Sequence, residues 1–223
     1  MNIANFSHIS YNTSEKAIIA MKGLWAVDGV HPDLINFLSD CWYEVHYFDR
    51  GWDTIVWIEE WSLEIYQNSI LDYVNFLLDS WKEVHLLGIS FWGYLSLKFA
   101  QEYSKKVKSV TAIAPLITCY KTISSLSIGE LNNEKKYTVW LLNGLKLDIL
   151  RVNVDILKNE QEIQIDIPWL VTLGTEDEFT SIADLSMIQW DRLKKIPLEW
   201  IWHLEITANI RNKCEIENFL KTI

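Results

Sequence analysis

Short apolar runs alternate along the chain with segments in which apolar residues recur at helical spacing. The apolar runs predict buried strands over 17–21, 43–48, 83–89, 110–114 and 167–173. A later segment alternates through Trp200 and Trp202 and predicts another strand over 198–204, whose upper end extends as far as Ile206. The helical segments predict helices over 33–40, 69–81, 91–103, 182–193 and 215–223. This alternation predicts an α/β fold with a mostly parallel central sheet and helices on both faces.

One long stretch interrupts the alternation of strands and helices. Residues 117–166 are too many for a simple connection in a compact domain, and they include a helix-like piece over 137–150. In open α/β sheets, ligands bind at the edge formed by the carboxyl ends of the strands. We therefore expect one domain over residues 1–223, with a small helical cap at about 117–166 above that edge.

The composition supports a folded domain and narrows its partners. Hydrophobic residues make up 49% of the 223 residues, which is enough for a large core. The formal net charge of -10 repels phosphate backbones, so we expect no nucleic-acid partner. No apolar stretch reaches the length of a transmembrane helix, and residues 1–13 lack the basic and apolar regions of a secretory signal.

The cysteines and histidines indicate no metal or redox centre. The three cysteines are widely spaced and form no CxxC pair, which favours a reducing cytoplasm. Four histidines precede the candidate acid described below and fit no metal-ligand spacing, and they are His8, His31, His46 and His85. His85 lies within an apolar strand pattern, so we expect a structural role for it. No glycine-rich phosphate loop is present, and we expect neither a nucleotide nor another cofactor.

A serine stands at the junction between a predicted strand and a predicted helix. The strand over 83–89 leads into Ser90, and the helix follows at once, in the sequence Gly88-Ile89-Ser90-Phe91-Trp92-Gly93. A turn of this kind presents a hydroxyl above the sheet, beside a helix N-terminus whose N–H groups favour developing negative charge. Strand and helix pack closely there and require small residues, and Gly88 meets that requirement.

This elbow segment resembles that of a known superfamily. The run VHLLGISFWGYLSLKFAQEYSKKVKSVTAIAP, over 84–115, is similar to the elbow region of the α/β-hydrolase superfamily, whose pattern is G-x-S-x-G-G. Weaker similarity extends over most of the chain, at Lys22-Gly23, Asp49-Arg50-Gly51 and Gly174-Thr175-Glu176-Asp177. Trp92 departs from the pattern, because the pattern has glycine there. The resemblance implies the α/β-hydrolase fold and a serine hydrolase or thioesterase-like activity.

The chain order of the superfamily, which is serine, acid and then histidine, implies an acid for Ser90. Asp177 fits this role because it lies just past the end of a predicted strand. Glu176 is the weaker candidate. The alternative interpretation is that Asp177 only caps the helix that follows it.

The catalytic base is less clearly placed than the acid. His203 is the only histidine after Asp177, and it falls inside or at the end of the predicted strand over 198–204. In the superfamily the catalytic histidine lies on the loop after that strand. At position 208, where a histidine would be expected on this loop, the chain has alanine. Two alternatives follow: the strand stops early and His203 reaches Ser90, or the base is absent.

The resemblance also implies an oxyanion hole and a substrate site. Its two donors would be the backbone N–H groups of Phe91 and Leu24. Leu24 lies at the corner that follows the strand predicted over 17–21. Lys22 departs from the His-Gly that family members often have at this corner, but a backbone donor survives that change. Trp25 and Trp92 are the candidate substrate-binding residues.

Two classes of function remain after these considerations. The first is hydrolysis of an ester or thioester of a small apolar acyl group by a Ser90–Asp177–His203 triad. The second is a catalytically altered or inactive member of the superfamily that binds a small molecule, or one that performs lyase, transferase or cyclase chemistry. Trp92, Lys22 and Ala208 motivate the second. The sequence selects no oligomeric state.

Overall fold

The computed structural model describes residues 6–8, 14–21, 32–48, 63–115, 163–177, 192–202 and 205–223. Its strands are β1 (Phe6–His8), β2 (Lys16–Met21), β3 (Glu44–Phe48), β4 (Glu83–Ile89), β5 (Ser109–Ile113), β6 (Trp169–Gly174) and β7 (Leu193–Leu198). The helices in these ranges are α1 (Pro32–Asp40), α2 (Leu63–Asp79), α3 (Phe91–Glu102) and α9 (Ile210–Leu220).

The described strands form one sheet in the order β1-β3-β2-β4-β5-β6-β7. β1 pairs with β3 antiparallel, and every other neighbouring pair is parallel. β4 therefore lies in the middle, with Gly88 opposite Met21 of β2 on one side and opposite Ala112 of β5 on the other. The predicted mostly parallel central sheet is confirmed.

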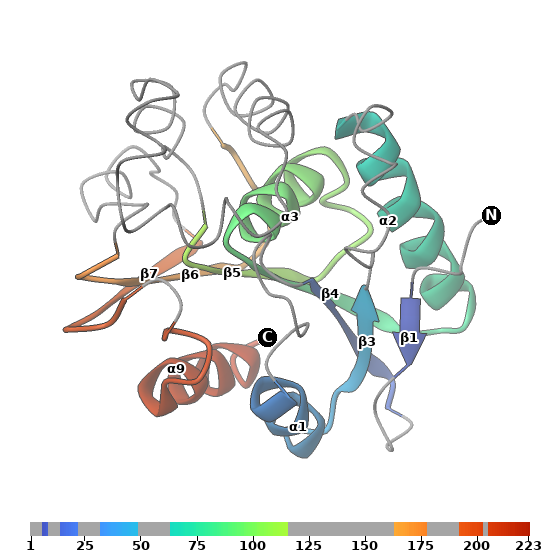
Figure 1. Ribbon diagram of the computed structural model, residues 1–223. Coiled ribbons are helices and arrows are strands. Elements are labelled where there is room, and N and C mark those ends of the chain that lie inside the picture. Colours follow the sequence, from blue (N-terminus) through green and yellow to red (C-terminus); the bar gives the residue numbers. More distant parts are fainter. Residues whose placement is uncertain are drawn as a thin grey trace, which may run out of the picture.

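Helices cover both faces of this sheet, as predicted. Figure 1 shows α2 and α3 on one face and α1 and α9 on the other. Four side chains of α2 at helical spacing are buried, and they are Ile70, Tyr73, Val74 and Leu77. β2, β4, β5 and β6 supply the middle of the core, with almost every side chain buried, which is typical of parallel strands covered on both faces.

β7 differs from the predicted late strand. The prediction of a strand over 198–204 is wrong, because β7 ends at Leu198 and a turn follows at 199–200. β7 is the last strand of the described sheet, and its residues are mostly half-buried. An edge strand of this kind tolerates lysines and Pro197, and such residues are typical of loops in sequence patterns. The alternation of Trp200 with Trp202 reflects two exposed side chains beyond the strand.

Three helix predictions also need correction at their ends. The helix predicted over 69–81 is α2, which begins earlier, at Leu63, and ends at Asp79. The helix over 182–193 cannot extend to Leu193, because that residue begins β7, and residues 178–191 lie outside the described part. The last helix begins at Ile210 rather than at residue 215 and ends at Leu220. Its N-cap is Asn209, whose side chain accepts the backbone N–H groups of Arg211 and Asn212.

Two other predictions concern the cap and the membrane. The predicted cap lies outside the described residues except for 163–166, and it stays a prediction. Among the helices that the structure describes, none combines the length and the apolar character that crossing a bilayer requires.

Candidate active site

Ser90 lies in a sharp backbone turn between β4 and α3. Its φ of 58° and ψ of -126° are unusual for a residue with a side chain. Such a conformation costs about 1–3 kcal/mol and persists only where the surroundings hold it. Two hydrogen bonds do so: the Ser90 N–H donates to the Ile113 carbonyl at 2.8 Å, and the Tyr94 N–H donates to the Ser90 carbonyl at 3.2 Å. The sequence therefore predicts this turn correctly.

Two glycines allow the strand and the helix to meet at this turn. A Cβ at Gly88 would overlap the backbone of Trp92, whose carbonyl carbon would lie 2.7 Å away. A Cβ at Gly93 would lie 3.0 Å from the Gly88 oxygen and 3.4 Å from Pro115 Cα. The Trp92 side chain is 7% exposed and belongs to the core. The elbow thus keeps glycine at both close approaches, and Trp92 does not prevent the turn.

Ser96 is a residue of the elbow that sequence reasoning missed. Its hydroxyl donates to the Trp92 carbonyl at 2.6 Å, and its oxygen lies 3.9 Å from Met21 Sδ. Ser96 is fully buried and fills the space beside Gly88. It joins the first turns of α3 to the end of β2. Only its position one helical turn after residue 92 could have signalled this role.

The first turn of α3 carries no acidic residue. Phe91 is the first residue of this helix, so its backbone N–H is at the positive end of the helix dipole. That end is not neutralised by a carboxylate of its own first turn. The backbone at Phe91 is therefore suited to stabilise negative charge beside Ser90.

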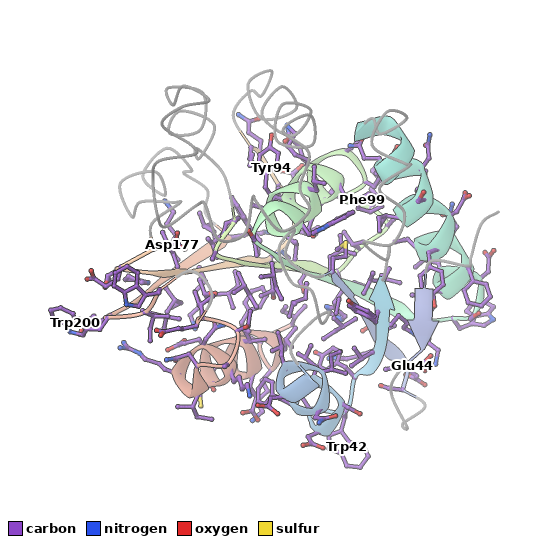
Figure 2. The ribbon with its side chains drawn as sticks, viewed as in Figure 1. Trp42, Glu44, Tyr94, Phe99, Asp177 and Trp200 are labelled. Atoms are coloured by element: carbon purple, nitrogen blue, oxygen red, sulfur yellow. The ribbon has the colours of Figure 1, made fainter. Side chains whose placement is uncertain are left out.

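Asp177, which is labelled in Figure 2, follows β6, as Ser90 follows β4. β4, β5 and β6 are parallel neighbours, so their carboxyl ends share one edge. The Asp177 N–H donates to the Gly174 carbonyl at 3.3 Å, and its side chain is half-buried. Glu176 is half-buried too, and its Oε1 lies 3.5 Å from Thr175 Oγ1.

The end of β6 is tied to the chain beyond β7. The Thr175 N–H donates to the Leu198 carbonyl at 2.9 Å, and the Glu176 N–H donates to the Ile201 carbonyl at 3.2 Å. A Cβ at Gly174 would overlap the Ile201 backbone. These contacts fix the backbone that leads to Asp177.

Solved structures of similar fold match nearly the whole chain. A lipase-esterase related protein from Clostridium acetobutylicum superposes with a TM-score of 0.70 at 15% identity, covering 96% of this chain and 98% of that one. Mouse alpha/beta hydrolase domain-containing protein 10 gives 0.68 at 14% identity, with 97% and 92% covered. The monoacylglycerol lipase of Paleococcus ferrophilus gives 0.64 at 17% identity, with 96% of each chain covered. The chain has the α/β-hydrolase fold. No protein-family model and no curated protein matches the sequence.

Three predicted site residues lie outside the described part, and they are His203, Leu24 and Trp25; Lys22, which precedes the predicted oxyanion corner, lies outside it too. The bounds of β7 bear on His203, because the strand ends at Leu198. One of the two alternatives for the base is that His203 reaches Ser90, and this alternative requires the strand to end early. Ala208 is exposed in the turn before α9, and its N–H donates to the Glu205 carbonyl at 3.2 Å.

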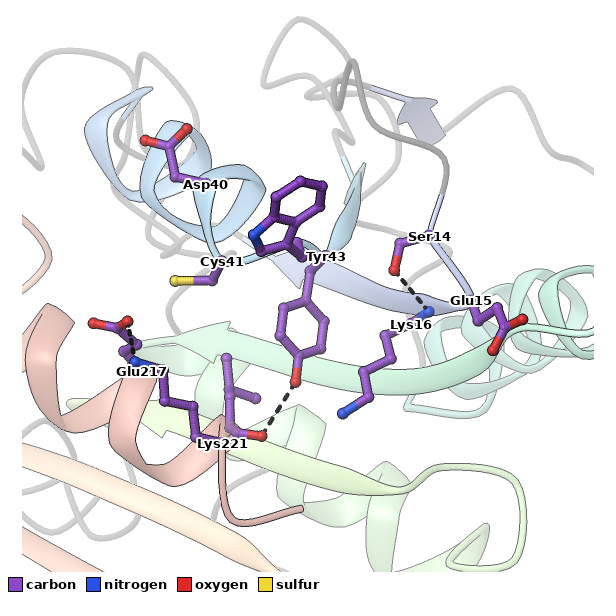
Figure 3. A pocket seen from close by; sticks show the side chains of 10 residues that line it. Ser14, Glu15, Lys16, Asp40, Cys41, Tyr43, Glu217 and Lys221 are labelled. Carbon is purple, nitrogen blue, oxygen red and sulfur yellow. Dashed lines mark hydrogen bonds and ion pairs between the residues drawn. The ribbon is translucent and has the colours of Figure 1, made fainter.

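A hollow of about 730 Å³ lies at the opposite edge of the sheet, by the starts of β2 and β3 and the end of α9 (Figure 3). Tyr43 donates its hydroxyl to the Leu220 carbonyl there at 3.3 Å, and Lys16 Nζ lies 5.8 Å from the Tyr43 ring centroid. Burial, with a smaller contribution from Glu217, raises the pKa of the Cys41 thiol to about 11, so the reactive thiolate is scarce. The hollow is remote from the elbow, and we assign no part of the chemistry to it.

His85 is structural, as expected. It is 1% exposed, and its Nδ1 lies 2.9 Å from Ser109 Oγ on the neighbouring strand. Burial, with Lys16 and Lys108, lowers its pKa to about 4, so it is neutral at physiological pH. Within the described ranges, no group of three or more His, Cys, Asp or Glu residues is arranged to hold a metal ion.

Proposed function

We propose that the protein hydrolyses esters or thioesters of small apolar acyl groups, with Ser90 as the nucleophile. The observation that carries this proposal is the strained, buried Ser90 turn between β4 and α3, braced by Ile113 and Tyr94. Strain of this kind clusters at functional sites. The names of similar structures, which include a monoacylglycerol lipase and an esterase, support the same reaction class.

The proposed reaction has two steps. Ser90 Oγ attacks the acyl carbonyl carbon while His203 accepts the hydroxyl proton, and the oxyanion is held by the N–H groups of Phe91 and Leu24. His203 then gives the proton to the departing alcohol or thiol, which leaves an acyl-Ser90 ester. Water attacks this ester with His203 as base, the carboxylic acid departs, and Ser90 recovers its proton. Asp177 orients His203 and stabilises its protonated form.

The acyl group would lie beside Trp25 and Trp92, beneath the cap that we place at about 117–166. Aromatic side chains supply large apolar contact area, and this favours an apolar acyl chain over a charged one. We place the reaction in the cytoplasm, where the cysteines stay reduced.

A panel of p-nitrophenyl esters and acyl thioesters tests this proposal. We expect turnover that depends on acyl length, is abolished in Ser90→Ala and is retained in Ser80→Ala, a variant of an exposed serine. If no member of the panel is turned over but an apolar acyl ligand binds, a non-hydrolytic binding function replaces the proposed one.

The base is tested separately. We expect His203→Ala to abolish ester turnover and Ala208→His to leave it unchanged. If turnover instead survives in His203→Ala and rises in Ala208→His, His203 is not the base.

A further inference from the structure

Three tryptophans have backbone conformations that suit glycine. Trp42, Trp81 and Trp200 have φ values of 65°, 59° and 63°. In this left-handed region a side chain collides with its own backbone, so a bulky residue there is an outlier. The other left-handed residues with a side chain in the described part are Ser90 and Ala114, which are both small.

Trp42 and Trp81 end helices α1 and α2 in the same hydrogen-bonding motif. After α1, the Trp42 N–H donates to the Ser39 carbonyl at 3.0 Å and the Tyr43 N–H donates to the Leu38 carbonyl at 3.4 Å. This pair of bonds defines a Schellman motif, and its left-handed residue is usually glycine.

The motif after α2 has the same pairing. The Trp81 N–H donates to the Leu78 carbonyl at 2.9 Å, and the Lys82 N–H donates to the Leu77 carbonyl at 3.0 Å. Trp81 is therefore in the left-handed position of a second Schellman motif. Two helices of one chain thus end on tryptophan at the position that glycine favours.

Trp200 lies in the turn that follows β7. Its N–H donates to Thr175 Oγ1 at 2.9 Å, and the next residue, Ile201, accepts the Glu176 N–H at 3.2 Å. The turn is thereby fixed against the end of β6. A left-handed residue within a tight turn is again a glycine position.

Packing does not explain tryptophan at these positions. Trp42, Trp81 and Trp200 are 77%, 91% and 79% exposed. Figure 2 shows Trp42 and Trp200 projecting away from the fold. Each of these side chains buries less than a quarter of its area, so packing gives little reason for tryptophan at these positions. The chain has 12 tryptophans and only 8 glycines, whereas average usage predicts about 16 glycines in a chain of this length.

We infer that residues 42, 81 and 200 are glycine positions of the fold, and that the protein made in its own cells carries glycine there. Some genetic codes read the codon UGA as tryptophan and others read it as glycine. A gene with UGA at these positions therefore encodes tryptophan under the first kind of code and glycine under the second. We infer that the cell of origin uses the second. Such a codon accounts for the left-handed backbone of these three tryptophans, for their exposed side chains and for the low number of glycines in the chain.

Position 92 does not belong to this set. Trp92 lies within helix α3, is not left-handed and is 7% exposed, so its packing in the core accounts for it. We therefore restrict the inference to residues 42, 81 and 200.

Peptide sequencing by mass spectrometry, on the protein purified from its own cells, tests the inference directly. We expect glycine at positions 42, 81 and 200. Trp169, which is fully buried in β6, serves as the internal control and is expected to be tryptophan. Tryptophan at position 42, 81 or 200 overturns the inference. The readout is independent of activity, so a failure of the proposed hydrolysis is distinguished from it.

Recombinant protein tests the structural basis independently. Chain synthesised with tryptophan is compared with Trp42→Gly, Trp81→Gly and Trp200→Gly variants. We expect Tm to rise by about 2–4 °C for each variant as backbone strain is relieved. Trp202→Gly is the matched control: Trp202 is 45% exposed but not left-handed, so this variant should gain nothing. A rise in Trp202→Gly equal to that in the other three, or no rise in those three, contradicts the assignment.

Discussion

The Ser90 backbone N–H donates a 2.8 Å hydrogen bond to the carbonyl of Ile113, the last residue of β5. The turn from β4 into α3 is therefore held by the neighbouring strand as well as by its own helix. A residue in this strained conformation needs such support, and the close approach at Gly88 depends on it.

Gly88→Ala should destabilise the fold. The added Cβ would overlap the Trp92 backbone, which cannot move without shifting the start of α3. Overpacking of this kind costs about 1–3 kcal/mol. Urea unfolding measures it, with Gly93→Ala as the control. That variant should lose less, because its nearest contact is 3.0 Å and alanine favours the helix. Equal stability of Gly88→Ala and the parent protein would show that the approach is not tight.

Glu44→Gln should remove a buried ion-pair network. Glu44 Oε2 lies 2.7 Å from Lys82 Nζ, and Oε1 lies 3.0 Å from His46 Nε2. Burial raises the pKa of Glu44, but the hydrogen bond from Lys82 and the electrostatic interactions with His46 and Lys82 outweigh it, and the pKa is lowered. We expect a loss of about 2 kcal/mol at neutral pH.

The sign of this contribution fixes its pH dependence. A carboxyl whose pKa is lowered by folding stabilises the protein above its unfolded pKa, and the stabilisation is lost as pH falls through the folded pKa. The stability difference between the parent and Glu44→Gln should therefore shrink in acid. Glu83→Gln is the control, because the Glu83–Lys108 pair is exposed at 3.6 Å and contributes about 0.5 kcal/mol or less. A Glu44→Gln loss no larger than that of the control would refute the network.

His85 should make the protein less stable in mild acid. Its pKa is about 4 in the folded protein, where burial is the main cause, against about 6.5 in the unfolded chain. The unfolded state then binds more protons between these values, so stability falls as pH decreases from about 6.5 to about 4. The loss is on the order of 2–3 kcal/mol. In His85→Gln, stability measured by urea unfolding should vary less across this window. An unchanged pH profile would contradict the assignment.

Asp177→Asn should lower kcat for a p-nitrophenyl ester by about 10⁴-fold, because an amide would no longer hold the histidine in its active form. Glu176→Gln is the matched control on the adjacent residue, and we expect a change of less than about tenfold. The reverse ranking would make Glu176 the acid.

The sequence predicts the centre of the fold better than its edge. β4 begins and ends where its apolar run does, because both of its faces are buried. β7 was missed because an edge strand tolerates Lys194, Lys195 and Pro197, and these residues hide the strand pattern. The start of α9 was missed because its first residues are mostly polar or exposed.

The candidate site was predictable only in part, for a similar reason. The turn at Ser90 follows from local sequence. The supports of that turn, Ile113 and Ser96, depend on which strands are neighbours and on how closely α3 approaches β4, and residue patterns do not carry this information. The left-handed backbone of Trp42 and Trp81 was equally out of reach, since tryptophan is not a residue that signals a helix end.

Labelling with a fluorophosphonate probe, followed by mass spectrometry of the peptide that contains Ser90, tests the central claim most directly. An activated Ser90 predicts a covalent adduct on this peptide, absent in Ser90→Ala and present in Ser80→Ala. No adduct under conditions in which a control serine hydrolase is fully labelled would contradict the assignment of Ser90 as a nucleophile.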